Sequence, residues 1–178
     1  MVEHNFTLVL ARSPGLEDGA AVEALGEAGA TDATVGRRAD GVWTAVFYRR
    51  ADTFEEALKS AIRDVRSAGL AVRRVEPDDL VTQAEVAERL GRSSESIRLL
   101  ATGQRGDGSF PAPVVRATSR GSLWRWSEVA AWAGFAAEEV ERATWIAVVN
   151  ARLQYGLFDT PKEKAMLKEV ERMLAGSK

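Results

Sequence analysis

Side chains that form strong hydrogen bonds gather in one short stretch, "LGRSSESIR", which spans residues 90–98. The stretch carries serine hydroxyl groups, the Glu95 carboxylate and the guanidinium groups of Arg92 and Arg98. It holds no histidine or cysteine, so its hydroxyl groups lack the adjacent base that would make them nucleophiles. A guanidinium presents planar pairs of donors and a carboxylate accepts them. This set suits recognition of a polar, charged partner better than a covalent reaction.

The composition of the whole chain excludes most catalytic chemistry. Its 178 residues include no cysteine, which removes disulfides, thiolate zinc sites and cysteine nucleophiles. The single histidine, His4, is interpreted as a solvated residue, because a metal site needs several converging ligands. We therefore expect no enzymatic activity, no catalytic residue, no metal site and no cofactor.

The stretch lies where two short helices are expected to meet. Thr82 and Glu85 have the spacing of a capping box and open a first helix, "QAEVAERL", which Gly91 ends. Ser93 caps a second helix, which ends at residues 102–103. Two helices of about eight residues joined by a short turn with glycine form a helix-turn-helix unit. The serines alone do not distinguish this unit from the corner of an ordinary helical bundle.

The residues downstream make that distinction. "GQRGDGSFPAP" predicts a loop, and "VVRATSRGSLWRW" predicts a hairpin with its turn near residues 119–121. Ser127, followed by Glu128, is predicted to cap a closing helix, "EVAAWAG". Residues 91–126 hold six arginines against Glu95 and Asp107, a net charge of 6 − 2 = +4 in a chain whose total is −2. A basic segment in a mildly acidic protein is the charge distribution expected for binding DNA.

From Leu80 to Trp132 the chain resembles the winged helix-turn-helix domains of the excisionase and AlpA type, within the broader MerR-like group. The resemblance is carried by "VTQAEVAERLGRSSESIRLLATG", then "FPAPV", then "LWRWSEVAAWA". It implies sequence-specific binding of double-stranded DNA, as a transcriptional regulator or a recombination accessory factor. Full MerR regulators continue into a long dimerisation coiled coil with an effector site. Only some 45 residues follow here, so an effector-response mechanism is not carried over and any small-molecule effector stays unknown.

The resemblance also implies roles for individual residues. The second helix would lie in the major groove, where Arg98 would donate to guanine, Glu95 would accept from cytosine and Ser94 would bind a base or a phosphate. Arg92 and the backbone amides of the two helix caps would bind phosphates, and Arg120 at the wing tip would reach the minor groove. The full set of expected DNA-binding residues is Thr82, Arg92, Ser93, Ser94, Glu95, Arg98, Leu99, Arg116 and Arg120.

One short recognition helix makes few base contacts, and many relatives have a basic residue near Ser94 or Leu99 that this chain lacks. We therefore expect a homodimer or a cooperative oligomer on DNA, because two linked modules bind more tightly than one. The alternative is a protein-interaction adaptor, antitoxin-like or scaffold-like, whose helix-turn-helix no longer binds DNA. Glu95 and the absence of lysine from residues 60–161 motivate this alternative.

The remaining sequence predicts an α+β protein in three parts. Residues 1–77 alternate strand and helix patterns in the order βαββαβ, which is typical of a ferredoxin-like domain. Their arginine pairs, such as Arg49-Arg50, are interpreted as solvated charges at strand ends. Residues 78–134 form the winged helix-turn-helix. Residues 135–178 predict two amphipathic helices that pack back on the DNA-binding domain or pair with a second copy.

The first residues, "MVEHNFTLVLARSPG", lack the basic start of a signal peptide, and no apolar run reaches the roughly 20 residues of a membrane span. We therefore expect no membrane partner and a cytoplasmic location.

Overall fold

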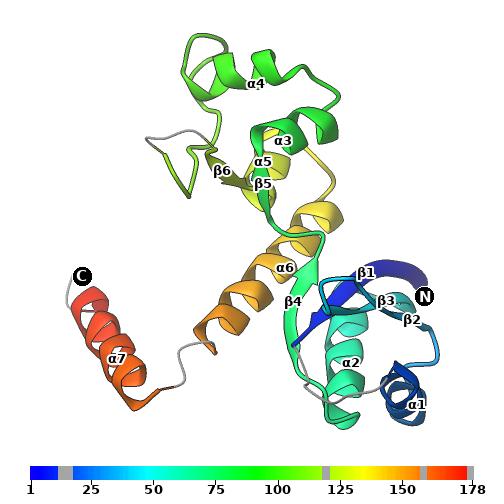
Figure 1. Ribbon diagram of the computed structural model, residues 1–178. Coiled ribbons are helices and arrows are strands. Elements are labelled where there is room, and N and C mark those ends of the chain that lie inside the picture. Colours follow the sequence, from blue (N-terminus) through cyan, green and yellow to red (C-terminus); the bar gives the residue numbers. More distant parts are fainter. Residues whose placement is uncertain (12–17, 118–120, 157–159, 176–178) are drawn as a thin grey trace.

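The computed structural model describes residues 1–11, 18–117, 121–156 and 160–175, and it mixes helices with antiparallel strands (Figure 1). No helix within these ranges is long and apolar enough to cross a membrane. The N-terminal unit contains six elements: β1 (Val2–Leu10), α1 (Asp18–Glu27), β2 (Ala33–Arg37), β3 (Trp43–Ala51), α2 (Phe54–Ser67) and β4 (Val72–Glu76). Their order is the one that the sequence pattern predicts.

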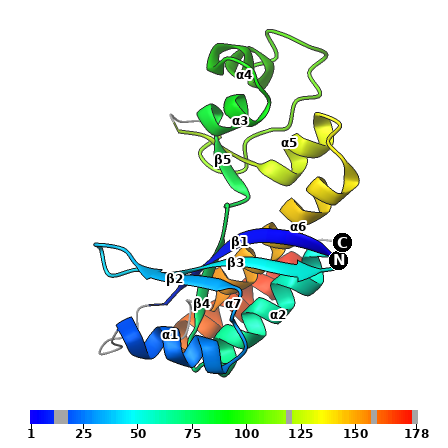
Figure 2. The ribbon, with the colours of Figure 1, turned by 90° about the vertical axis from the view of Figure 1, so that its right-hand side faces the viewer.

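The strands of the N-terminal unit form one sheet in the order β2-β3-β1-β4, with every neighbouring pair antiparallel. Side chains alternate between the faces of a strand, so Phe6 and Leu8 of β1 and Ala45 and Phe47 of β3 all point to one side and are buried. Helices α1 and α2 cover this side (Figure 2) and complete the core with residues such as Leu58. The helices and strands of this unit therefore enclose one hydrophobic core.

Arg49 corrects one prediction. It follows the inward series of β3 and is only 9% exposed, whereas the sequence suggested a solvated charge. Its Nε and Nη2 donate to Asp32 at 2.8 and 2.6 Å, and its Nη1 donates to Asp64 at 2.6 Å. Hydrogen bonding to Arg49 lowers the pKa of Asp32, and the Asp32 carboxylate raises the pKa of Arg49. The buried Arg49 is thus paired with two carboxylates. These ion pairs connect the turn before β2, which carries Asp32, to α2, which carries Asp64.

The central unit follows directly and has its own core. Its elements are β5 (Leu80–Thr82), α3 (Gln83–Arg89), α4 (Ser94–Ala101), β6 (Leu123–Arg125) and α5 (Trp126–Trp132). The core residues are Val81, Val86, Ala87, Ile97, Leu100, Trp124, Trp126, Val129, Ala130 and Ala143.

The strand pairing of the central unit differs from the predicted hairpin over residues 114–126. The returning strand β6 pairs with β5, in the register Val81↔Trp124, and β5 was not expected from the sequence. Val115 meets Leu123 through a single bridge, so the described residues 114–117 of the predicted hairpin form no regular strand. Of the predicted turn at 119–121, residues 119 and 120 lie outside the described residues. The Leu123 N–H donates to the Val115 carbonyl at 3.0 Å and the Leu123 carbonyl accepts from the Val114 N–H at 2.8 Å, so part of the predicted hairpin is present and β5 pairs with β6 in addition.

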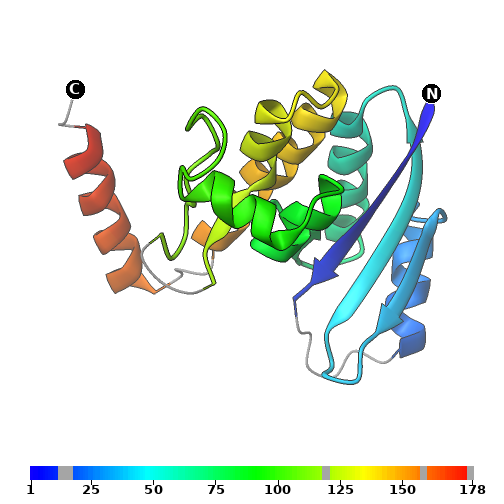
Figure 3. The ribbon, with the colours of Figure 1, turned by 90° about the horizontal axis from the view of Figure 1, so that it is seen from above.

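Helix α6 (Ala137–Tyr155) packs on both units. Ile146 belongs to the core of the N-terminal unit, and Ala143, less than one turn earlier, belongs to the core of the central unit. The first C-terminal helix therefore packs back, which is one of the two arrangements considered from the sequence. Helix α7 (Pro161–Ala175) has no buried residue and stands apart from the other elements (Figures 1 and 3).

Asn150 of α6 binds the backbone of the edge strand β4. Its Oδ1 accepts from the Val75 N–H at 2.7 Å, and its Nδ2 donates to the Val75 carbonyl at 3.0 Å. The side chain is 5% exposed, so water has little access to these groups. One amide side chain thus satisfies the donor and the acceptor of a residue on the edge of the sheet, where backbone groups otherwise lack partners.

Replacing Asn150 with alanine is expected to lower the free energy of unfolding by about 1–3 kcal/mol, because both backbone groups of Val75 lose a buried partner. Urea unfolding followed by circular dichroism measures this change. Gln154→Ala, one turn further along the same helix and exposed, is the matched control and should change stability by less than about 0.5 kcal/mol. Equal effects of the two changes would contradict the role assigned to Asn150.

Candidate nucleic-acid interface

Local caps and a small apolar contact position α3 and α4. Thr82 and Glu85 form the capping box that the sequence predicts, and Ser93 Oγ accepts from the Ser96 N–H at 3.2 Å. Gly91 has φ of 61°, a left-handed conformation that glycine adopts without strain, at the turn between the helices. The Ile97 side chain, on the inner side of α4, is fully buried. Helices of seven and eight residues are marginal alone, so caps and burial supply their stability.

A side-chain contact between the two helix starts was missed from the sequence. Gln83 Nε2 donates to the Ser94 carbonyl at 2.9 Å, which ties the first turn of α3 to the first turn of α4. A glutamine at the start of a helix gives no sequence signal for a contact with a residue eleven positions away. This bond helps to fix the angle at which α4 presents its outer face.

Arg98 and Glu95, expected to read separate bases, bind each other on the outer face of α4. Arg98 Nε donates to Glu95 Oε2 at 2.8 Å, and Nη2 donates to Oε1 at 2.7 Å. The hydrogen bond from Arg98 lowers the pKa of Glu95, so this carboxylate stays charged at neutral pH. Residues three apart on a helix are neighbours, so the spacing of Glu95 and Arg98 could have indicated this pair. Nη1 takes no part in the hydrogen bonds to Glu95.

The other expected residues of the helix pair have varied surroundings. Ser94 is exposed and Leu99 is partly exposed, both at the surface of α4. The Thr82 amide, expected to bind phosphate, donates to Glu85 Oε2 at 2.7 Å, and this bond lowers the pKa of Glu85. A phosphate at Thr82 would have to displace this carboxylate. The structure therefore places Ser93, Ser94, Glu95, Arg98 and Leu99 together and leaves Thr82 engaged within its own helix.

Two arginines of the helix pair lie over tryptophan rings. The Arg92 guanidinium carbon is 5.8 Å from the ring centroid of Trp132, and that of Arg89 is 4.8 Å from Trp126. Such cation–π contacts restrict a flexible side chain without neutralising its charge. Trp132 is itself held, since its Nε1 donates to Ser109 Oγ at 3.0 Å. The exposed Arg92, next to the cap of α4, is thus a cation placed by packing.

Of the two arginines expected in the wing, Arg116 and Arg120, the structure describes Arg116. Arg116 is exposed and has φ of 53°, and its carbonyl accepts from Ser122 Oγ at 3.0 Å. Arg120, the residue expected to reach a minor groove, lies outside the described residues.

Asp79 is a central residue that the sequence pattern did not reveal. It is 2% exposed; its Oδ1 accepts from the Ser127 N–H at 3.0 Å and its Oδ2 from Arg125 Nη1 at 3.2 Å. The prediction that Ser127 caps α5 is wrong: the helix begins at Trp126, and the side chain of its N-cap residue, Arg125, makes no hydrogen bond to the first turn. Asp79 satisfies the first turn of α5 from 48 residues away.

The same residue changes the local charge. Asp79 precedes the basic segment along the chain and pairs with Arg125, so it offsets the charge of one of the six arginines counted there. The linker-like run that contains it, "PDD", gave no indication of this role.

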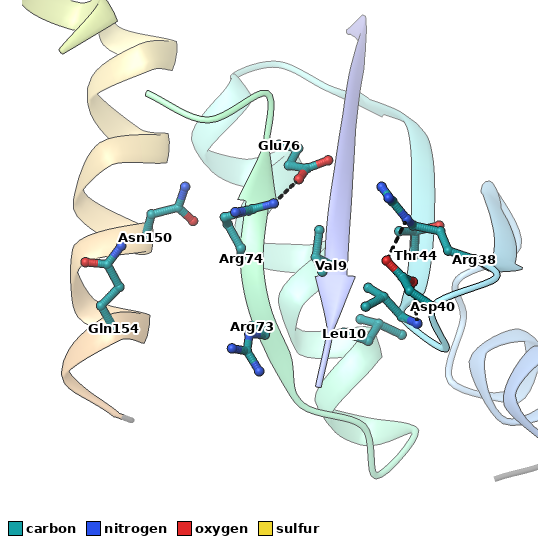
Figure 4. A pocket seen from close by; sticks show the side chains of 11 residues that line it. Val9, Leu10, Arg38, Asp40, Thr44, Arg73, Arg74, Glu76, Asn150 and Gln154 are labelled. Atoms are coloured by element: carbon teal, nitrogen blue, oxygen red, sulfur yellow. Dashed lines mark hydrogen bonds and ion pairs between the residues drawn. The ribbon is translucent and has the colours of Figure 1, made fainter. Parts of the chain in front are cut away.

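A hollow lies on the face of the sheet that α1 and α2 do not cover (Figure 4). Arg74 in this hollow pairs with Glu76, and Arg38 pairs with Asp40 at 3.4 Å. Because each of these two cations already has a carboxylate partner, the hollow offers less attraction for an anion than its arginines suggest.

Comparison of the chain with protein-family models, curated proteins and solved structures finds no match.

Replacing Asp79 with alanine is expected to lower the free energy of unfolding by about 1–3 kcal/mol, because a partly buried amide and a partly buried guanidinium lose their acceptor. Thermal or urea unfolding measures the loss. Glu128→Ala, an exposed carboxylate in the first turn of α5, is the control and should cost less than about 0.5 kcal/mol. If Glu128 matters more than Asp79, the cap of α5 has been assigned to the wrong residue.

Proposed function

We propose that the chain is a cytoplasmic, sequence-specific double-stranded DNA-binding protein, a transcriptional regulator or recombination accessory factor. Residues 80–134 act as a winged helix-turn-helix. The observation that carries the proposal is the placement of α4: Ile97 anchors it, while Ser94 and Arg98 lie on its outer side. A recognition helix enters the major groove with its N-terminal residues at the base edges. The residues at the start of α4 have the side chains that such a position requires.

Arg98 is proposed to read a guanine while Glu95 orients it. Glu95 occupies Nε and one hydrogen of Nη2, which leaves Nη1 and the second hydrogen of Nη2 for the base. These two groups form the outward edge that binds guanine O6 and N7. A guanidinium held by a carboxylate loses less side-chain entropy on binding. The cost is one negative charge close to the DNA backbone, so Glu95 increases selectivity and decreases total affinity.

Arg92 is proposed to bind a phosphate at the edge of the groove. It is exposed, precedes the cap of α4 and rests on Trp132, so its charge is available at the end of the helix that also carries the partial positive charge of the helix dipole. Phosphate contacts fix the register of the protein on DNA without reading sequence.

The N-terminal unit is proposed to be a ferredoxin-like domain that α6 braces against the DNA-binding domain. The order βαββαβ, the antiparallel strand order β2-β3-β1-β4 and the two helices on one face support this interpretation. Because α6 contributes to both cores, the sheet is expected to move with the recognition helix rather than independently.

The second candidate is a protein-interaction adaptor. It is favoured by the Arg98–Glu95 pair, which leaves little net charge at the middle of the outer face of α4. A 1:1 complex with a protein that forms without nucleic acid, and that tolerates loss of Arg92 and Arg98, would support the adaptor and contradict the DNA-binding proposal.

The DNA-binding proposal is tested by selecting sites from random duplex DNA and measuring affinities for the selected sequences by gel shift over a series of salt concentrations. Arg98→Ala is expected to weaken the best site roughly tenfold or more and to relax one base position. Arg92→Ala should weaken all sequences alike and reduce the slope of log K against log salt by about 1. The control, Arg63→Ala, removes an exposed charge from α2 and should change neither quantity. Absence of salt-sensitive binding by the folded protein would refute the proposal.

Glu95→Gln tests the orienting role. The change removes a negative charge and one acceptor, so we expect affinity for random DNA to rise about two- to fivefold while discrimination at the base read by Arg98 falls. Competition gel shifts with matched and mismatched duplexes measure both quantities. Glu88→Gln, which removes an exposed charge from α3, is the control and should raise affinity less and leave discrimination unchanged. Increased discrimination in Glu95→Gln would show that the carboxylate only obstructs Arg98.

A further inference from the structure

Helix α7 carries an apolar stripe that is largely exposed to solvent. Met166, Val170, Met173 and Leu174 recur at spacings of three and four residues, so they share one face of the helix. Their exposed fractions are 60%, 44%, 61% and 72%. An amphipathic helix of this kind gains stability in water when another apolar surface covers its stripe.

A matching surface lies on α6. A shallow, mainly apolar hollow runs along it, lined by Ala137, Val140, Glu141, Thr144, Trp145 and Val148. Val148 is 56% exposed, although the opposite side of the same helix is buried through Ala143 and Ile146. Each chain thus carries one exposed stripe and one exposed hollow on helices of similar length.

The charges on the two helices favour a parallel alignment. Residues 137–148 hold three glutamates and one arginine, net −2, whereas residues 161–168 hold three lysines and one glutamate, net +2. The later halves are also opposite: residues 149–155 carry +1 and residues 169–175 carry −1. A parallel alignment places opposite charges together, and an antiparallel one places like charges together.

The groups around the hollow agree with this pattern. Glu141 lines it, whereas the guanidinium of Arg142 is turned to the N-terminal unit, where it donates to the Asn5 carbonyl. Lys59 lies over the Trp145 ring at the margin of the hollow and pairs with Glu55.

A parallel alignment cannot form within one chain. In that alignment Pro161, the first residue of α7, would lie beside Ala137, the first residue of α6. The length of α6 from Ala137 to Tyr155 is about 27 Å, since each of the 18 steps rises about 1.5 Å. The six Cα-to-Cα steps from residue 155 to residue 161 span at most about 22 Å. The chain is too short to return along α6, so only the antiparallel hairpin, with its like charges together, is open to a single copy.

We propose that two copies of this chain form a twofold dimer in which α7 of each copy lies parallel to α6 of the other and covers its hollow. A twofold axis makes the contact twice and covers both stripes and both hollows at once. The dimer does not depend on DNA binding. A dimer that binds no DNA would leave this inference standing and remove the proposed function.

The first test measures the mass of the full chain by light scattering after gel filtration, over roughly 1–100 µM protein and without DNA. Val148→Glu in the hollow and Val170→Glu in the stripe are each expected to raise the dimer dissociation constant roughly tenfold or more, because each would bury a charge. Val22→Glu on α1 is the control, a similarly exposed valine that should not affect the dimer. Circular dichroism confirms folding of each variant. A monomer throughout, or a dimer unaffected by both changes, would overturn the proposal.

The second test fixes the orientation. The chain has no cysteine, so single cysteines can be introduced without competing thiols. In the parallel alignment Leu174 lies within one helical turn of Val148, and in the antiparallel one it lies close to Ala137. Two variants of different tag length, Val148→Cys and Leu174→Cys, are mixed and oxidised, and the disulfide-linked mixed pair is expected on gels. Preferential linkage of Ala137→Cys to Leu174→Cys would overturn the parallel arrangement.

Discussion

The structure depends on the burial of one helix, α6, against two hydrophobic cores. Ile146 enters the core beneath the sheet and Ala143 enters the core beneath the helix pair, so one rigid element sets the position of each unit relative to the other. Asn150 adds hydrogen bonds to the edge of the sheet that an apolar residue could not make. Apolar contact provides the stability of this arrangement, and the amide provides its register.

The central unit is small, and long-range polar contacts complete what its short elements cannot supply. Its strands have three residues each and its helices seven or eight, too short to be stable alone. Asp79 satisfies the start of α5, and Gln83 connects the starts of α3 and α4. These bonds position the helix that carries Arg98, and so the precision of the candidate site originates in residues that would not touch DNA.

Several arginines of the central unit are restrained before any partner arrives. Arg98 and Arg125 are held by carboxylates, and Arg92 lies over an aromatic ring. A carboxylate lowers net charge while it fixes geometry, and an aromatic ring fixes geometry while it preserves charge. The two kinds of support match two proposed tasks, since base reading benefits from orientation and phosphate binding benefits from charge.

The sequence by itself determined the features governed by neighbours along the chain. β-branched and aromatic content identified β1, and period-two alternation identified β3. The spacing of Thr82 and Glu85 and the position of Ser93 identified the starts of α3 and α4. The period of about 3.6 residues in a helix predicted that Ser94 and Arg98 lie on the outer side of α4. DNA binding by these residues stays a prediction.

Only the tertiary structure decided which distant groups meet. It paired Asp79 with the start of α5, buried Arg49 between two carboxylates, joined β6 to β5 and seated Asn150 on the edge of the sheet. The physical reason is that a carboxylate, an amide or a three-residue strand has the same local pattern with or without a remote partner. Burial of the two cores brings these groups together, and the cost of leaving any of them unpaired there selects their partners.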